Sequence, residues 1–369
     1  MWYAAHSGFG NQLVALQNAL LLGALVNRTV VVPPLLEHFD AFLGKRCARS
    51  SDHAAVIRSA LPRYARRAEQ RWSDVLVLPP ETSTVVYDPH TMNLPAQSDV
   101  DAGVSAALCA AASGCATTSG SDEGSVWAAL ERRSTQPTLL VGSLFHGQAV
   151  LLRAAGLDRA PALAWRTDAA ALFPPALAAR AAATDCLQVR AVASGNVLSV
   201  DLRARLRQLQ VVRGASRLFV ASNARADLVC DHLREGGALR PRARCFGRDE
   251  LERSVDPRTM QAFSTNTRAL LLDAFACTHA RHAYHLSSSA SPSTLWRFII
   301  DSRAAIAAGH RQANESLRTS NAPAAPPPRR ARSDRSVRSV RADRSHSASS
   351  ESGWLAAIIG TVRWALGSR

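Results

Sequence analysis

The chain has 369 residues, of which 47% are hydrophobic, so it is a globular protein able to bury one large core or two medium ones. Its formal charge of +15 would suit a nucleic-acid-binding protein. However, Lys45 is the only lysine, and part of the arginine excess lies between residues 329 and 344. Positive charge in a tail does not indicate a nucleic-acid-binding groove in the folded part. The folded part also has no basic strand with interleaved aromatic residues, so we expect no nucleic-acid binding there.

The seven cysteines form neither CxxC pairs nor a Cys/His cluster with zinc spacing, which argues against a structural zinc site. An odd, scattered set fits a lumenal enzyme with one or two disulfides and equally a cytosolic protein with buried thiols. No signal-peptide pattern or membrane anchor precedes the first glycine turn. Because the sequence starts directly on a predicted core strand, we expect a truncated gene model.

The first elements are an apolar strand at residues 1–5, a turn with the sequence Gly8-Phe-Gly-Asn-Gln12, and a helix over 12–26. Apolar residues cover nearly every face of that helix, which predicts burial inside a layered α/β domain. A strand that breaks at two glycines and continues as a helix leaves N–H groups uncovered at the helix N-terminus. The turn therefore predicts a binding loop for an anion or diphosphate.

Further strands are predicted at 29–32, 74–78, 84–87 and 138–141. Asn27-Arg-Thr29 is formally a glycosylation sequon, but we interpret Asn27 as the C-cap of the preceding helix. Residues 88–124 are rich in Ala, Ser, Gly and Asp, which indicates a variable insertion.

A second series of alternating elements begins near Leu163. The pattern predicts helices at 177–184, 202–212, 227–234 and 260–279, and strands at 186–189, 217–221 and 282–286. Two such series predict an α/β fold with two Rossmann-like domains, at 1–160 and 161–312, that face each other across a cleft. Ligands of such halves bind at the carboxyl ends of the strands.

Residues 313–369 are predicted to be a disordered basic tail, because the Pro-, Arg- and Ser-rich stretch 321–352 is too polar to fold alone. The apolar segment 354–366 is shorter than the ~20 residues that cross a bilayer. It predicts an interfacial or docking helix and a weak membrane contact.

Four motifs, in this order, resemble the GDP-fucose protein O-fucosyltransferase superfamily. They are the glycine turn followed by Asn27-Arg-Thr-Val-Val-Val-Pro33, the strand Cys186-Leu-Gln-Val-Arg190, the strand Leu218-Phe-Val-Ala-Ser-Asn223, and Leu272-Asp-Ala-Phe-Ala-Cys-Thr-His-Ala280 with Ser293-Thr-Leu-Trp296 and Arg303 beyond. The resemblance spans residues 1 to about 305 and implies a two-domain fold of the GT-B type. It also implies GDP-fucose as donor substrate, no other cofactor, and a place in the endoplasmic reticulum or Golgi lumen.

The resemblance implies a role for each matching residue. Arg190 would neutralise the departing β-phosphate bidentately without a metal, and Asn11 would position donor and acceptor. Gly8, Phe9, Gly10 and Gln188 would line the substrate site, and the Ser293 and Thr294 hydroxyls would donate hydrogen bonds to the diphosphate. We expect the glycine turn, Arg190 and the Ser293–Thr294 pair to line one cleft between the domains.

Several positions depart from the family pattern. Gln188 stands where the family usually has His, Asn223 replaces an Asp, and Arg281 occupies a position that is often acidic in the family, which challenges guanine recognition. His6, His146 and His285 are candidate general bases.

Asp99-Val-Asp101 is a competing motif, because paired carboxylates of this kind hold Mg²⁺ or Mn²⁺ against a nucleotide diphosphate in other glycosyltransferases. No apolar strand precedes it, so we interpret it as a solvated loop and predict no metal site.

Together these features predict an inverting, metal-independent transfer of fucose from GDP-fucose to a protein Ser/Thr hydroxyl. Three alternatives stay open at this point: a glycan-directed fucosyltransferase, an inactive nucleotide-sugar-binding relative, and an RNA-associated protein that acts through its Arg/Ser tail.

Overall fold

The computed structural model describes residues 1–5, 8–37, 53–78, 82–93, 138–144, 148–158, 163, 165, 173, 175–190, 198–253, 263–287 and 293–320. Residues 1–305 form one compact unit and residues 306–369 a second. The helix α12 (Thr294–Ser320) contributes to both units. Both sheets and all the contacts described below belong to the first unit.

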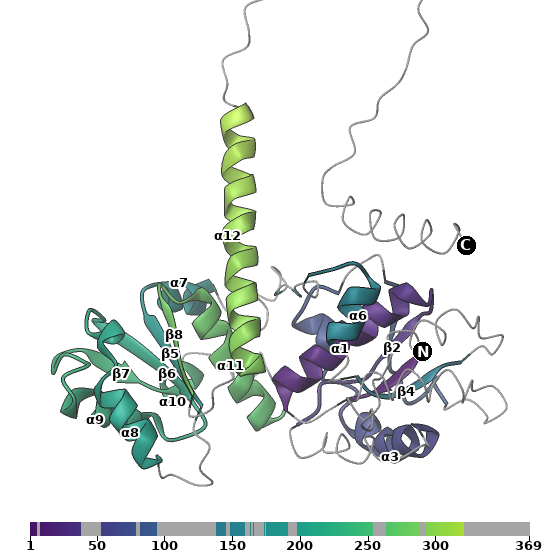
Figure 1. Cartoon of the computed structure of the whole chain (residues 1–369), viewed down its shortest axis with the longest axis horizontal. Coiled ribbons are helices and arrows are strands. Elements are labelled where there is room, and N and C mark those ends of the chain that lie inside the picture. The colour runs from purple at the N-terminus through teal and green to yellow at the C-terminus, as the bar shows by residue number, and fades with distance from the viewer. Residues whose placement is uncertain are drawn as a thin grey trace, which may run out of the picture. The chain divides into compact units, whose positions relative to one another are not determined.

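The first sheet is built by the N-terminal half, where Figure 1 labels two of its strands, β2 and β4. It has four parallel strands in the order β3-β2-β1-β4. The strands are β1 (Trp2–Ala4), β2 (Val30–Val32), β3 (Thr84–Val86) and β4 (Leu140–Ser143). The helical elements of this half are α1 (Phe9–Leu25), α3 (His53–Arg66), the 3-10 turn η1 (Trp72–Asp74) and α6 (Gln148–Ala154).

Helix α1 is buried on almost every side, as its uniform apolar content predicts. It ends in a Schellman motif: the N–H of Arg28 donates to the carbonyl of Gly23 at 2.8 Å, and the N–H of Asn27 donates to Ala24 at 3.3 Å. Asn27 adopts a left-handed φ of 52°, a conformation that Asn tolerates better than most residues. The C-cap itself is Val26, one residue earlier than predicted, and Asn27 occupies the left-handed position that follows the cap.

The second sheet, in the C-terminal half, repeats the arrangement of the first. Its order is β7-β6-β5-β8, again parallel, with the first strand of the half next to the second and the fourth. Its strands are β5 (Asp185–Arg190), β6 (Arg217–Ser222), β7 (Arg244–Phe246) and β8 (Ala283–Ser287). The accompanying helical elements are α7 (Pro175–Ala182), α8 (Val200–Arg207), η4 (Gln210–Val212), α9 (Ala226–Glu235), α10 (Arg248–Glu252) and α11 (Thr265–His279).

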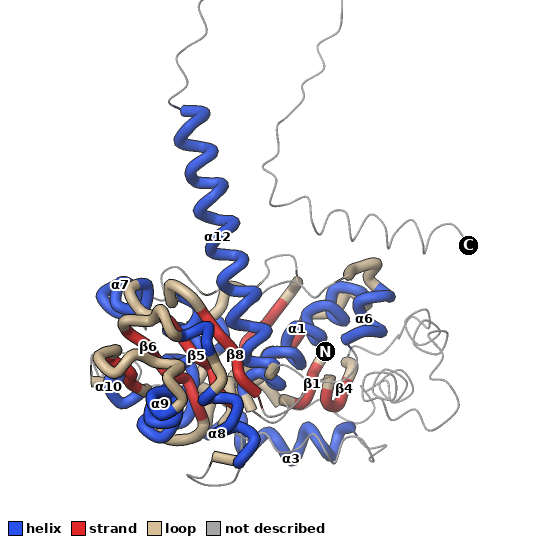
Figure 2. The backbone as a smooth tube through the Cα atoms, turned by 60° about the vertical axis from the view of Figure 1, so that its left-hand side comes forward, coloured by secondary structure: helices blue, strands red, loops and turns tan. Residues whose placement is uncertain are grey.

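The two faces of the second sheet pack into different apolar clusters. Leu187 and Val189 of β5 join α8 and α9, which lie beside this sheet in Figure 2. On the opposite face, Cys186 and Phe219 pack with α11 in a larger cluster that also contains α1 and the first sheet. Aromatic contacts run through this larger cluster, since Phe298 of α12 touches both Phe9 and Trp165. The two halves therefore share apolar core.

The predicted α/β class with two Rossmann-like sheets is confirmed. The predicted strand at 74–78 is wrong: η1 ends at Asp74, and beyond it Leu76 makes only an isolated bridge to Trp165. The predicted helix 260–279 begins, within the described residues, at Thr265, where Ser264 caps it. The domain boundaries at 160 and 312 stay predictions, and α12 continues past the second to Ser320. Most of the insertion 88–124 and the stretches 321–352 and 354–366 lie outside the described residues.

Candidate functional site

A pocket of about 460 Å³ lies where the carboxyl ends of strands from both sheets meet. Each sheet has its first strand flanked by its second and fourth, so the chain leaves β1 and β5 at a topological switch point. Ligands of open α/β sheets bind at such points. The residues that line the pocket are Gly8, Phe9, Gly10, Asn11, Leu35, Leu36, Glu37, Gln188, Val189, Arg190, Ala221, Ser222, Asn223, Arg248, Asn266, Thr267, Leu270, Asp273, Ser293, Thr294 and Leu295.

All eight residues predicted from the sequence to form the site line this one pocket. They come from three separate stretches: the turn after β1, the end of β5, and the start of α12. The structure thus brings together residues up to 286 positions apart, from Gly8 to Thr294. Their individual chemical roles stay predictions.

The glycine turn packs tightly against the start of α12. A Cβ atom at Gly10 would lie 2.1 Å from Oγ1 of Thr294 and 2.8 Å from the backbone N of Leu295, which no side chain tolerates without movement. Beside it, the Thr294 hydroxyl donates to Oδ1 of Asn11 at 3.3 Å. The N-cap of α1 is Gly8, which has no side chain to satisfy the first N–H groups of the helix.

Gln12, the last residue of the turn motif, does not line the pocket but supports its wall. Its amide Nε2 donates to the carbonyl of Leu36 at 2.7 Å, and its Oε1 accepts from the Leu36 N–H at 2.9 Å. Both contacts are buried. This pair of hydrogen bonds fastens the segment after β2, which carries Leu35, Leu36 and Glu37 into the lining.

Gln188 and Arg190 occupy alternate positions at the carboxyl end of β5, so they lie on the same face of the sheet. Gln188 is buried, and its Oε1 accepts a long hydrogen bond of 3.4 Å from the Ser293 hydroxyl. Arg190 is exposed at the strand end. Its position next to Ser287 of β8 places it directly at the switch point.

Ser293 is the N-cap residue of α12. Its Oγ accepts from the Trp296 N–H at 3.0 Å, which satisfies one of the unpaired donors of the first turn. Thr294 is already the first residue of the helix. The Ser293 hydroxyl therefore has a structural role in addition to any contact with a ligand.

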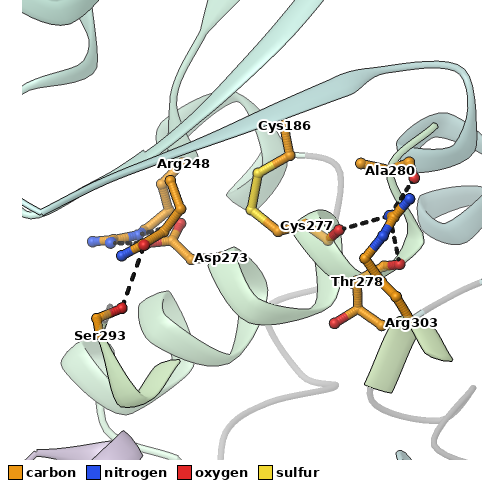
Figure 3. Close-up of a disulfide and its surroundings, with 9 residues drawn as sticks. Cys186, Arg248, Asp273, Cys277, Thr278, Ala280, Ser293 and Arg303 are labelled. Carbon is orange, nitrogen blue, oxygen red and sulfur yellow. Dashed lines mark hydrogen bonds and ion pairs between the residues drawn. A yellow bond between two sulfur atoms is a disulfide. The ribbon is translucent and has the colours of Figure 1, made fainter. Parts of the chain in front are cut away.

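An Arg248–Asp273 pair in the pocket lining was missed by sequence reasoning. Nε and Nη2 of Arg248 donate to the two carboxylate oxygens of Asp273, at 3.2 and 2.5 Å (Figure 3). Asp273 lies on α11 and is almost fully buried, and burial raises the pKa of its carboxyl to about 6 even though Arg248 opposes the shift. The buried Asp within the apolar stretch of α11 was the signal available in the sequence.

A second carboxylate in the lining, that of Glu37, was also missed. Its Oε1 accepts from Arg67 of the N-terminal half at 3.1 Å, and its Oε2 accepts from Asn266 at the start of α11 at 3.4 Å. Glu37 thus contacts both halves at the edge of the pocket. Nothing in its local sequence separates it from an ordinary surface glutamate.

Two charged or titratable residues singled out in the sequence, Arg281 and His285, lie outside the pocket lining. Arg281 is not at the pocket: it binds both carboxylate oxygens of Asp185, at 3.0 and 2.8 Å, at the amino end of β5. Arg281 is therefore engaged with Asp185 and is not among the residues that line the pocket. His285 is not in the lining either, because it stacks on Trp296 with ring centroids 5.1 Å apart, and burial lowers the pKa of its imidazole. His6 and His146 lie outside the described residues.

Asp99 and Asp101 also lie outside the described residues. Within the ranges that the structure describes, no group of three or more His, Cys, Asp or Glu side chains is arranged to hold a metal ion.

The fold and the pocket define a Rossmann-like α/β protein with a pocket at the carboxyl ends of its parallel strands. No family model matches the chain. A 44-residue stretch is 52% identical to a protein named O-fucosyltransferase 30 from Arabidopsis thaliana. The stretch covers 12% of this chain and 9% of that protein. The match suggests a relative of the O-fucosyltransferases and a glycosyltransferase-like protein.

Two disulfides connect the described cysteines, Cys186 with Cys277 and Cys230 with Cys245. Such bonds persist in oxidising compartments, so they fit the secretory pathway. Among the described helices, none has the length and apolar content needed to span a membrane.

Proposed function

We propose that the protein transfers fucose from GDP-fucose to the hydroxyl of a protein Ser or Thr, with inversion at the sugar carbon and without an obligatory metal. The observation that carries the proposal is the meeting of the glycine turn, Arg190 and the Ser293–Thr294 pair in one pocket. The 44-residue identity to a plant O-fucosyltransferase supports fucose as the transferred sugar.

Three helix N-termini supply the electrostatic argument for a diphosphate. First-turn residues of α1, α11 and α12 all line the pocket, and these helices are 17, 15 and 27 residues long. The N-terminus of a helix carries about half a positive charge and outward-facing N–H groups. A nucleotide diphosphate is a ligand whose charge and length suit three such ends and two lining arginines, Arg190 and Arg248.

In the proposed reaction the acceptor oxygen forms a bond to the anomeric carbon while the bond from that carbon to the β-phosphate oxygen breaks. GDP leaves with the bonding electrons, and the hydroxyl proton passes to a base. Negative charge grows on the β-phosphate, where the Arg190 guanidinium would neutralise it. Asn11 would orient the acceptor. Glu37 and Asp273 are the carboxylates in the lining, and Arg248 engages the second of them.

The decisive experiment incubates the purified full chain with GDP-fucose, GDP-mannose and UDP-sugars and measures nucleotide release and product mass. We expect release of GDP from GDP-fucose alone, and fucosylation of a Ser/Thr-containing protein acceptor. Transfer from a UDP-sugar, or binding of none of these donors, contradicts the proposal. Fucose found on a glycan instead moves the assignment to a glycan-directed enzyme.

A second candidate is a non-catalytic protein that binds a nucleotide sugar. It is favoured by Gln188, a neutral amide where the resembling family usually has an imidazole, and by Asn223 in the lining where that family has an Asp. Donor binding with a measurable affinity, but no GDP release above the rate without protein, would select this candidate.

A further inference from the structure

The Cys186–Cys277 disulfide ties β5 to α11 across 91 residues of sequence. Both cysteines are fully buried, in the larger apolar cluster that also contains α1. Figure 3 shows the bond on the same helix as Asp273, with the Arg248–Asp273 pair close by. The two elements that it joins both supply residues to the pocket.

The positions of the two cysteines align with pocket residues on each element. Along β5, Cys186 shares its face with Gln188 and Arg190, because side chains alternate along a strand. Along α11, Cys277 follows Asp273 by four residues, and residues four apart lie on the same side of a helix. The bond therefore lies directly behind the place where the side of α11 bearing Asp273 meets the face of β5 bearing Gln188 and Arg190.

The second disulfide provides an internal comparison. Cys230 of α9 and Cys245 of β7 belong to the apolar cluster on the other face of the second sheet. No residue of α9 or β7 lines the pocket within the described part of the chain. The two bonds thus serve the same sheet, but only one of them connects two pocket-lining elements.

We propose that the Cys186–Cys277 disulfide positions the pocket, by holding Asp273 of α11 in register with Gln188 and Arg190 of β5. Without the bond, only side-chain packing and hydrogen bonds restrain the helix from sliding over the strand. A shift of about 1 Å in a pre-organised site is enough to cost on the order of a hundredfold in function. The choice of ligand in the test below rests on the proposed function.

The test compares two double variants of the full chain, Cys186→Ala/Cys277→Ala and the matched control Cys230→Ala/Cys245→Ala. Binding of GDP is measured by calorimetry at a temperature at which wild type and both variants are folded by circular dichroism. We expect the dissociation constant to rise at least tenfold in the first variant and to change less than twofold in the control. Equal changes in the two variants, or no change in either, overturn the proposal.

A measurement without ligand separates this proposal from the proposed function. Amide hydrogen exchange of α11 and of the end of β5 should rise in the first variant, and exchange of α8 should not. If wild type fails to bind GDP, the proposed function fails, and the exchange data alone decide the positioning role. Unchanged exchange in α11 then overturns it.

If the first variant does not fold, Cys186→Ala/Cys277→Val restores part of the lost volume and takes its place. Failure of this variant as well, while the control folds, would show a requirement of the whole fold and would count against a specific positioning role.

Discussion

Arg190 is the residue on which the proposed chemistry depends most. If its guanidinium meets the leaving phosphate, Arg190→Ala should lower turnover about a hundredfold, on the order of 3 kcal/mol, with the fold intact. Arg190→Lys should not restore activity, since an ammonium cannot make the planar two-point contact. Initial rates of GDP release measure both effects. Arg234→Ala, which removes a surface arginine from an i,i+3 pair with Asp231, is the matched control. Near-normal rates in the Arg190 variants would contradict the assignment.

Asp273 should make stability depend on pH in a defined direction. Burial raises the pKa of its carboxyl to about 6 from 3.8. Between pH 3.8 and 6 the folded chain therefore keeps a proton that the unfolded chain has already released. The resulting stability is fully present below pH 3.8 and is lost as pH rises through 6. Relative to Asp273→Asn, which does not titrate, wild type should lose on the order of 1 kcal/mol between pH 5 and 7.5.

The comparison of melting temperatures at the two pH values tests this prediction. Because other titrating groups are common to both proteins, they cancel in the difference between wild type and variant. A difference that stays constant from pH 5 to 7.5 would show that the carboxyl of Asp273 titrates normally.

The contact between α1 and α12 requires a glycine at position 10. Gly10→Ala should push Thr294 and the first turn of α12 away, because the new Cβ would lie 2.1 Å from Oγ1 of Thr294. Overpacking of this kind costs roughly 1–3 kcal/mol. We expect a lower melting temperature together with weaker GDP binding. Gly214→Ala, where nothing lies within 4 Å of the added Cβ, should change neither. Unaltered binding in Gly10→Ala would mean that the two helix ends need not be close.

Long apolar elements were predictable from the sequence, and short or mixed ones were not. Helix α1 is apolar over most of its 17 residues, and strand β6 has the apolar centre Leu-Phe-Val-Ala, so each pattern has few alternative structures. Residues 74–78 have the composition of a strand, but they form the end of a 3-10 turn and an isolated bridge. The three-residue strand β7 was missed, because its Arg-Cys-Phe sequence has no periodicity to detect.

The composition of the pocket was predicted only where a motif stood out in the sequence. The glycine turn, Arg190 and the Ser293–Thr294 pair were found through their order along the chain. Pocket residues that lie outside those motifs were not: Arg248 opens a short helix, and Asn266 and Glu37 look like surface residues. Only the folding of two similar sheets against a common apolar cluster brings such residues to one place.

The last prediction concerns how much of the chain the folded unit needs. Among the α12 residues whose burial is described, the buried ones are Phe298, Ile299 and Ser302, all before Ala305. In addition, Arg303 donates from Nη1 to the carbonyls of Cys277, Thr278 and Ala280, as Figure 3 shows, and so caps the end of α11. The first three turns of α12 are thus part of the core.

Ending the chain after residue 315 should therefore leave the melting temperature within about 2 °C of the full chain. Ending it after residue 292 should prevent cooperative folding, because burial of a Phe or an Ile contributes about 1.5–3 kcal/mol each and a whole domain has only about 5–15 kcal/mol to lose. Calorimetric scans of both truncations test the pair of expectations. If the chain that ends after residue 315 melts well below the full chain, the apolar segment 354–366 stabilises the folded unit. The prediction that residues 313–369 are a disordered tail would then be wrong.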